Sequence, residues 1–132
     1  MHKIEIGATH TISIVADEKF SARAYGSGDV DVYATPAMIL HMEMAAAAAV
    51  KPALDAGFAT VGTRVDIEHM AASPMGANIR AIATLRQIEG RRLIFDVSAH
   101  DNTEQIGRGT HERFIIDTAK FMQRVENKIK EK

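Results

Sequence analysis

The chain has 132 residues, with 16 basic and 17 acidic side chains and no cysteine. Its length suits one domain with a single core, residues 1–132, and its balanced charge gives no electrostatic reason to expect a nucleic acid or a membrane surface as partner. The lack of cysteine excludes disulfides and thiolate chemistry and is compatible with a reducing compartment. No leader-like segment or spanning apolar stretch is recognisable, so we expect a cytoplasmic protein.

The first third of the chain has one strand pattern and one polar loop. His10–Val15 alternates and is rich in β-branched residues, which predicts a strand. Ala24–Asp31 contains Gly26-Ser27-Gly28-Asp29, which predicts a flexible loop.

The next element is a helix that is apolar on nearly every side. It is predicted from Pro36 to Lys51, with Thr35 as its N-cap and Pro36 at its first position. Such a helix is expected to be fully enclosed, yet it carries Glu43. A buried carboxylate costs several kcal/mol unless it is paired or neutralised. Glu43 is therefore either bound to a buried partner or a candidate for chemistry.

The rest of the chain is strand-like until a short final helix. Four segments have period-two or β-branched character: Thr60–Glu68, Asn78–Ile88, Leu93–Ala99 and Ile106–Ile116. Glu89-Gly90-Arg91 and Asp101-Asn102-Thr103 are predicted hairpin connections between the last three. The pattern predicts an antiparallel meander of three or four strands after a central helix.

Thr118–Lys132 predicts a charged helix with one apolar stripe. Its apolar residues are Phe121, Met122, Val125 and Ile129. Such a stripe is suited to docking against the domain or a partner subunit.

A long antiparallel sheet around one buried helix is the hotdog arrangement, an α+β fold. Several blocks resemble, in order, the fluoroacetyl-CoA thioesterase group of hotdog proteins: Ala34-Thr35, Glu43, Val61-Gly62-Thr63, the segment from Ile67 to Gly76, Glu89 to Leu93, and Ile106 to Arg113. The resemblance runs from about residue 33 to about residue 117 and includes the segments that would carry a site.

The resemblance implies hydrolysis of a small acyl-CoA thioester. It places Thr35, Glu43 and His69 at the family's catalytic positions, Gly62 where a backbone amide faces the thioester, and Arg113 among the residues that line the site. A thioester requires a positioned nucleophile, a proton acceptor and a donor to the oxyanion. Glutamate can attack the carbonyl or activate water, histidine can carry protons near neutral pH, and threonine can donate to the carbonyl or attack it. The resemblance implies no cofactor, since CoA is part of the substrate.

Each residue also has a structural interpretation. Thr35 could be an N-cap alone, and an isolated histidine such as His69 is more often structural than catalytic. A metal site is not expected, because His41 and Glu43 point to different sides of a helix. His111-Glu112-Arg113 also lacks the second histidine of a zinc motif.

The sequence is compatible with more than one acyl substrate and with alternative functions. Selective family members resemble one another in a phenylalanine-bearing lid before the helix, whereas Ala22–Tyr33 contains Tyr25 and Tyr33 but no phenylalanine. Acetyl-CoA or another short acyl-CoA is therefore as admissible as the fluorinated substrate. A hotdog hydratase and a non-catalytic acyl-CoA-binding or sensing domain are the alternatives. We expect a homodimer or a higher homo-oligomer, because a lone subunit leaves a sheet edge uncovered.

Overall fold

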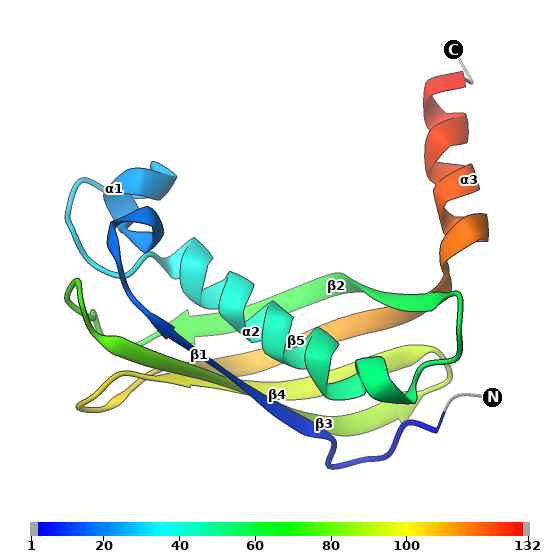
Figure 1. Ribbon diagram of the computed structural model, residues 1–132, viewed down its shortest axis with the longest axis horizontal. Helices are drawn as coiled ribbons and strands as arrows, with labels where there is room; N and C mark the ends of the chain where they lie inside the picture. The colour runs from blue at the N-terminus through cyan, green and yellow to red at the C-terminus, as the bar shows by residue number, and fades with distance from the viewer. Residues whose placement is uncertain (1–2, 131–132) are drawn as a thin grey trace.

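A five-stranded antiparallel sheet wraps around one long helix in the computed structural model, which describes residues 3–130 (Figure 1). The strands are β1 (Thr9–Val15), β2 (Phe58–His69), β3 (Asn78–Glu89), β4 (Arg92–His100) and β5 (Gln105–Asp117). The helices are α1 (Ala22–Tyr25), α2 (Thr35–Val50) and α3 (Thr118–Lys130), with short 3-10 turns η1 (Glu18–Phe20) and η2 (Lys51–Ala53). All five predicted strands and both long helices are confirmed.

The sheet order is β1-β3-β4-β5-β2, so the predicted meander is confirmed for three strands, β3, β4 and β5. Only β3, β4 and β5 follow one another as hairpins, while β2 pairs with β5 and forms an edge of the sheet. Strand order could not be inferred from periodicity, because every strand has the same alternating pattern. The consequence is that β2 has one side without a strand partner.

The helix α2 is buried on one side only. Met38, His41 and Met42 are buried, whereas Leu40 is 40% and Met44 43% exposed. The prediction of a fully enclosed helix is therefore wrong for the single chain. An apolar pattern on every side of a helix predicts that every side is covered in the working protein. The surface that covers one of these sides can belong to another molecule.

The start of α2 also differs from the prediction. The N-cap is Ala34, without a side-chain hydrogen bond, and Thr35 is the first helical residue. The carbonyl of Ala34 already accepts the first helical bond, from the amide of Met38 at 3.0 Å. The hydroxyl of Thr35 is therefore not used to cap the helix.

The segment between β1 and α2 is more ordered than a loop. It folds into η1 and α1, where Asp17 and Ser21 accept hydrogen bonds from the amides of Lys19 and Ala24. These turns are too short to produce a readable hydrophobic period. They form a cover over the N-terminal end of α2 (Figure 1).

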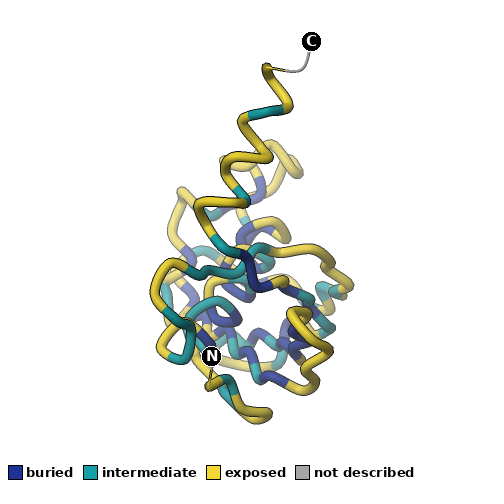
Figure 2. Tube along the Cα trace, turned by 90° about the vertical axis from the view of Figure 1, so that its right-hand side faces the viewer, coloured by how far each residue is buried: buried dark blue, intermediate teal, exposed yellow. Residues whose placement is uncertain are grey.

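The helix α3 leaves the body at the end of β5 and stands clear of the sheet (Figures 1 and 2). It contains no buried residue, and Ile129 is 74% exposed. Its apolar stripe is thus not docked on its own domain. The predicted last two residues of this helix lie outside the described residues.

Candidate active site

Thr35 and His69 form a direct side-chain pair. Thr35 begins α2 and His69 ends β2, and the packing of these two elements places Oγ1 of Thr35 2.7 Å from Nδ1 of His69. Nε2 of His69 is buried and has no hydrogen-bond partner among the described residues. Burial lowers the pKa of His69, and the nearby backbone of Ala71 partly opposes this shift. A neutral imidazole beside a hydroxyl can accept its proton.

Glu43 lies with Gly62 and Arg113, in the first half of β2 and away from His69 at its end. A Cβ added to Gly62 would come within 2.9 Å of Oε2 of Glu43, so the carboxylate faces the backbone of β2 directly. Arg113 lies 3.9 Å from the same oxygen, and the Glu43 side chain is 38% exposed. Glu43 is therefore a partly exposed carboxylate with a buried cationic neighbour, not the fully enclosed acid that the sequence predicts.

Arg113 is held in place by its neighbours on the sheet. Its Nε donates to Oγ1 of Thr60 at 2.8 Å, and NH2 donates to the carbonyl of Thr60 at 2.9 Å. Desolvation by burial lowers the pKa of Arg113, and the carboxylate of Glu43 opposes that shift. With these bonds made, NH1 is directed toward Glu43 and His111.

His111 orients Arg113 from the same strand. Nδ1 of His111 lies 2.7 Å from the carbonyl oxygen of Arg64, and a carbonyl can only accept, so Nδ1 carries the proton. Nε2 then presents a lone pair to NH1 of Arg113 at 3.2 Å. Burial is the main cause that lowers the pKa of His111, in agreement with a neutral ring. A shift in the β2–β5 register between Gly62 and Arg64 accompanies this arrangement.

Sequence reasoning missed Thr60 and His111. Residues 111 and 113 are two positions apart in a strand and must share one face of the sheet. The identification of Arg113 as a site residue therefore predicts that His111 lies beside it. Thr60 could not be found, because its contact depends on the pairing of β2 with β5.

The five candidate residues form two groups within one chain. Thr35 is joined to His69, and Glu43 to Gly62 and Arg113, but no hydrogen bond or ion pair links the two groups in residues 3–130. Eight helical residues separate Thr35 from Glu43, about 12 Å along the axis. Seven strand residues separate Gly62 from His69, about 23 Å.

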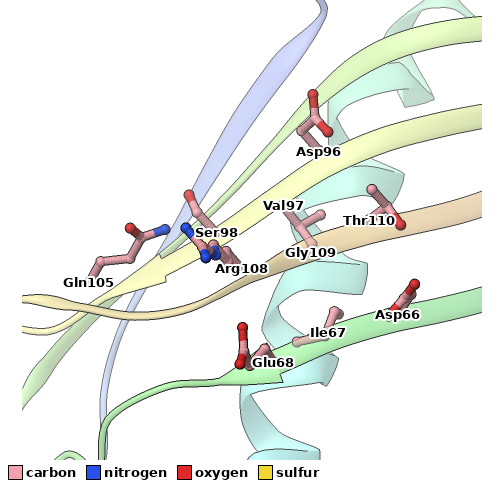
Figure 3. A pocket seen from close by; sticks show the side chains of 10 residues that line it. All are labelled: Asp66, Ile67, Glu68, Asp96, Val97, Ser98, Gln105, Arg108, Gly109 and Thr110. Carbon is pink, nitrogen blue, oxygen red and sulfur yellow. The ribbon is translucent and has the colours of Figure 1, made fainter.

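The cavities also distinguish the Thr35–His69 pair from the group around Glu43. A cavity of about 360 Å³ adjoins Thr35 and His69 and is also lined by residues between Ala22 and Tyr33. A larger one of about 590 Å³ lies on the outer face of β2, β4 and β5, with α2 behind the strands (Figure 3). Its side chains include Asp66, Glu68 and Arg108 but none of the five candidate residues. The outer cavity is therefore not the candidate active site.

No cluster of three or more His, Asp or Glu side chains in residues 3–130 has the geometry to hold a metal ion. Over the same residues, none of the helices is long and apolar enough to cross a membrane.

A family model described as fluoroacetyl-CoA-specific thioesterase matches residues 15–119. The chain belongs to this family. The fluoroacetyl-CoA thioesterase of Streptantibioticus cattleyicolor is 44% identical over 98 residues, which make up 74% of this chain and 70% of that protein. The chain is an acyl-CoA thioesterase with the hotdog fold.

Solved structures agree with this family assignment. The structure of the fluoroacetyl-CoA thioesterase FlK matches with a TM-score of 0.88 and 36% identity over 95% of this chain and 97% of that one. A thioesterase superfamily member from Thermus thermophilus matches with a TM-score of 0.89 and 28% identity over 100% of both chains.

Proposed function

We propose that Thr35, Glu43 and His69 are the catalytic residues of this thioesterase. The observation that carries the proposal is the 2.7 Å contact between Oγ1 of Thr35 and Nδ1 of His69, made by a hydroxyl that is not used as a helix cap. A hydroxyl that donates to a neutral histidine is the pairing that activates a nucleophile or holds a donor toward a carbonyl. A threonine-to-serine variant of FlK was solved in complex with acetyl-CoA.

Glu43 supplies the carboxylate of the reaction. It either removes a proton from the water that attacks the thioester carbonyl, or attacks the carbonyl itself to form an acyl anhydride that water then hydrolyses. In both routes the C–S bond breaks, and the thiolate of CoA takes up the proton given up by water, with His69 as the carrier of that proton. Arg113, fixed by Thr60 and His111, orients the carboxylate. Gly62 has no side chain, so the thioester can approach the backbone of β2, whose amide donates to the developing oxyanion.

The working unit is a homodimer joined through β2. This strand is an edge of the sheet, and its residues 62–66 are exposed. Beside this edge, α2 presents the exposed apolar side chains of Leu40 and Met44. A second copy related by a two-fold axis would pair with the free backbone and cover this apolar face. The stripe on α3 gives a further apolar contact.

The dimer also completes the site. Antiparallel pairing of two β2 edges around a two-fold axis sets the end of one strand beside the start of the other. The Thr35–His69 pair of one copy then lies near the Glu43–Gly62 group of the second copy. Each dimer would hold two such sites, which resolves the separation of the two groups within one chain.

The substrate is an acyl-CoA, without a requirement for the fluorinated acyl group, since residues 22–33 contain no phenylalanine. The reaction needs no cofactor, because every chemical role is assigned to a side chain or to the backbone. A cytoplasmic location fits the supply of acyl-CoA and the lack of cysteine.

The test is steady-state hydrolysis of acetyl-, fluoroacetyl- and longer acyl-CoA esters, with the released thiol followed by a colour reagent. Glu43→Gln keeps the size of the side chain but removes its charge, so kcat should fall by about 10² or more. Glu104→Gln, an exposed loop position, is the matched control and should retain parent activity. A folded Glu43→Gln protein with parent kcat would remove Glu43 from the mechanism and favour a binding or sensing role for this group.

Thr35 variants separate catalysis from helix stability. Because Thr35 makes no cap bond, Thr35→Ala should lose activity while its melting temperature stays close to that of the parent, and Thr35→Ser should restore most of the rate. A loss of an N-cap would instead cost about 1 kcal/mol of folding free energy.

A further inference from the structure

We infer that the cavity beside Thr35 and His69 binds the acyl chain, and that the enzyme prefers straight acyl groups of about four to eight carbons over acetyl. This inference rests on the proposed site, since it takes the Thr35–His69 pair as the place where the thioester carbonyl lies. The occupant is an uncharged, flexible hydrocarbon chain.

The cavity is larger than an acetyl group. Its volume of about 360 Å³ falls within the range of about 300–1,000 Å³ that is usual for small-molecule pockets. A group of the size of water occupies about 30 Å³ in a liquid, so an acetyl group would leave most of this space unfilled. Unfilled space gives no binding free energy, whereas a longer chain would gain it by packing against the apolar part of the wall.

The lining of the cavity has no charged side chain that could bind the phosphates of CoA. Within the described part of the chain, no Asp, Glu, Lys or Arg side chain lines this cavity. Ser27, Tyr33, Thr35 and His69 bring polar groups to it, and the rest of its wall is made by Ala22, Gly28, Val30, Val32, Met70, Ala71 and Ala72. Such walls do not suit the phosphates of CoA, which require cations or many donors. They suit an apolar chain that extends from a carbonyl held at Thr35 and His69.

The segment before α2 contributes one aromatic ring to the cavity. Among residues 20–33, all of which the structure describes, Tyr33 is the one Phe or Tyr that lines the cavity. Its hydroxyl lies 2.5 Å from Nδ1 of His41, and its ring stacks on that of His41 at an interplanar angle of 6°. Phe20 packs edge-on against the same imidazole. Contact with His41 thus anchors these two rings on α2, and Tyr33 is the one aromatic ring that residues 20–33 contribute to the wall of the cavity.

The experiment measures kcat/KM for acetyl-, butyryl-, hexanoyl- and octanoyl-CoA. Burial of one methylene favours binding by about threefold to fourfold, so the parent should show a hexanoyl-to-acetyl ratio of at least about ten. Gly28→Leu and Val30→Phe add volume at two lining positions and should lower this ratio at least about fivefold. At Gly28 an added Cβ would meet Ala22 at an ordinary 3.5 Å, so the fold should tolerate the change.

Ile88→Phe enlarges an exposed apolar residue that does not line the cavity and serves as the control, with an unchanged chain-length profile. A parent enzyme whose rate falls steadily from acetyl to octanoyl would overturn the inference while leaving the proposed function intact. A filling variant that slows acetyl- and hexanoyl-CoA equally would show that the cavity holds the pantetheine arm instead. Failure to hydrolyse any ester would contradict the proposed function itself.

Discussion

Gly62 is the residue whose missing side chain most directly determines the geometry around Glu43. An added Cβ would lie 2.9 Å from Oε2 of Glu43, 3.2 Å from Cε1 of His111 and 3.4 Å from NH1 of Arg113. Gly62→Ala should therefore displace the carboxylate, and a misplacement of about 1 Å can cost up to 10² in rate. We expect kcat to fall at least about tenfold with little change in melting temperature, because the displaced group is the end of a flexible side chain. Parent kcat in this variant would mean that Glu43 is not held at Gly62 during turnover.

His111 is the residue on which the orientation of Arg113 depends. His111→Leu would leave the carbonyl of Arg64 and NH1 of Arg113 without their imidazole partner. A buried polar group left unsatisfied costs about 1–3 kcal/mol, so the free energy of unfolding measured with urea should fall by about that amount. Phe114→Leu, at an exposed position on the same strand, should change it by less than about 0.5 kcal/mol. Equal effects of the two substitutions would show that the His111 bonds contribute no stability.

At the scale of single residues, the sequence was a good guide to which side chains matter and a poor guide to how they are used. Thr35 followed by Pro36 has the composition of a helix start, but the hydroxyl bonds to His69, which is 34 residues away. Glu43 was expected to be enclosed, yet its side chain is partly exposed. Both differences arise from tertiary contacts, which local patterns do not encode.

At the scale of elements, the pairing of β2 with β5 depends on two glycines in β5. A Cβ at Gly109 would lie 2.1 Å from the carbonyl oxygen of Asp66, a backbone atom that cannot move without shifting the strand. A Cβ at Gly107 would instead meet Sδ of Met38 at 2.5 Å, in a flexible side chain. Gly107→Ala should cost about 1–3 kcal/mol as overpacking, and Gly109→Ala should cost clearly more. Urea unfolding of the two variants tests this order, and the reverse order would contradict the close approach of β2 and β5.

Element types and limits were predictable, because strands and helices differ in hydrophobic period. Neither the position of β2 at the edge nor the short helices before α2 could be predicted. Strand order depends on which pairing buries the most surface, and turns of three or four residues have no period to detect. The length of β2 separates Gly62 from His69 in one chain, and its edge position leaves one side of the strand without a partner.

At the scale of the whole molecule, three histidines should make the fold sensitive to acid. Burial lowers the pKa of His41, His69 and His111. The unfolded chain, with histidine pKa values near 6.5, therefore binds protons before the folded chain does, and stability falls as the pH drops below about 6.5. Above that pH all three are neutral in both states, so no change is expected from them between pH 7 and 8. Melting temperatures at constant ionic strength from pH 8 to pH 5 should show this decline, and a flat or rising profile below pH 6.5 would contradict it.

Assembly is the second property of the whole molecule. A free β2 edge beside the exposed side chains of Leu40 and Met44 predicts a particle of at least two chains. Light scattering at micromolar concentration should give a mass of at least twice the 14.4 kDa of one chain. A mass of one chain would remove the basis for a site shared by two copies.

The most direct measurement of the central claim combines two inactive variants. Thr35→Ala and Glu43→Gln chains are unfolded together in equal amounts, refolded and assayed with an acyl-CoA ester. If each site takes Thr35 and His69 from one copy and Glu43 from the other, half of the dimers are mixed and each mixed dimer holds one intact site, so about a quarter of the parent activity should return. Activity that stays at the level of the separate variants, in a sample shown to contain mixed dimers, would contradict the account.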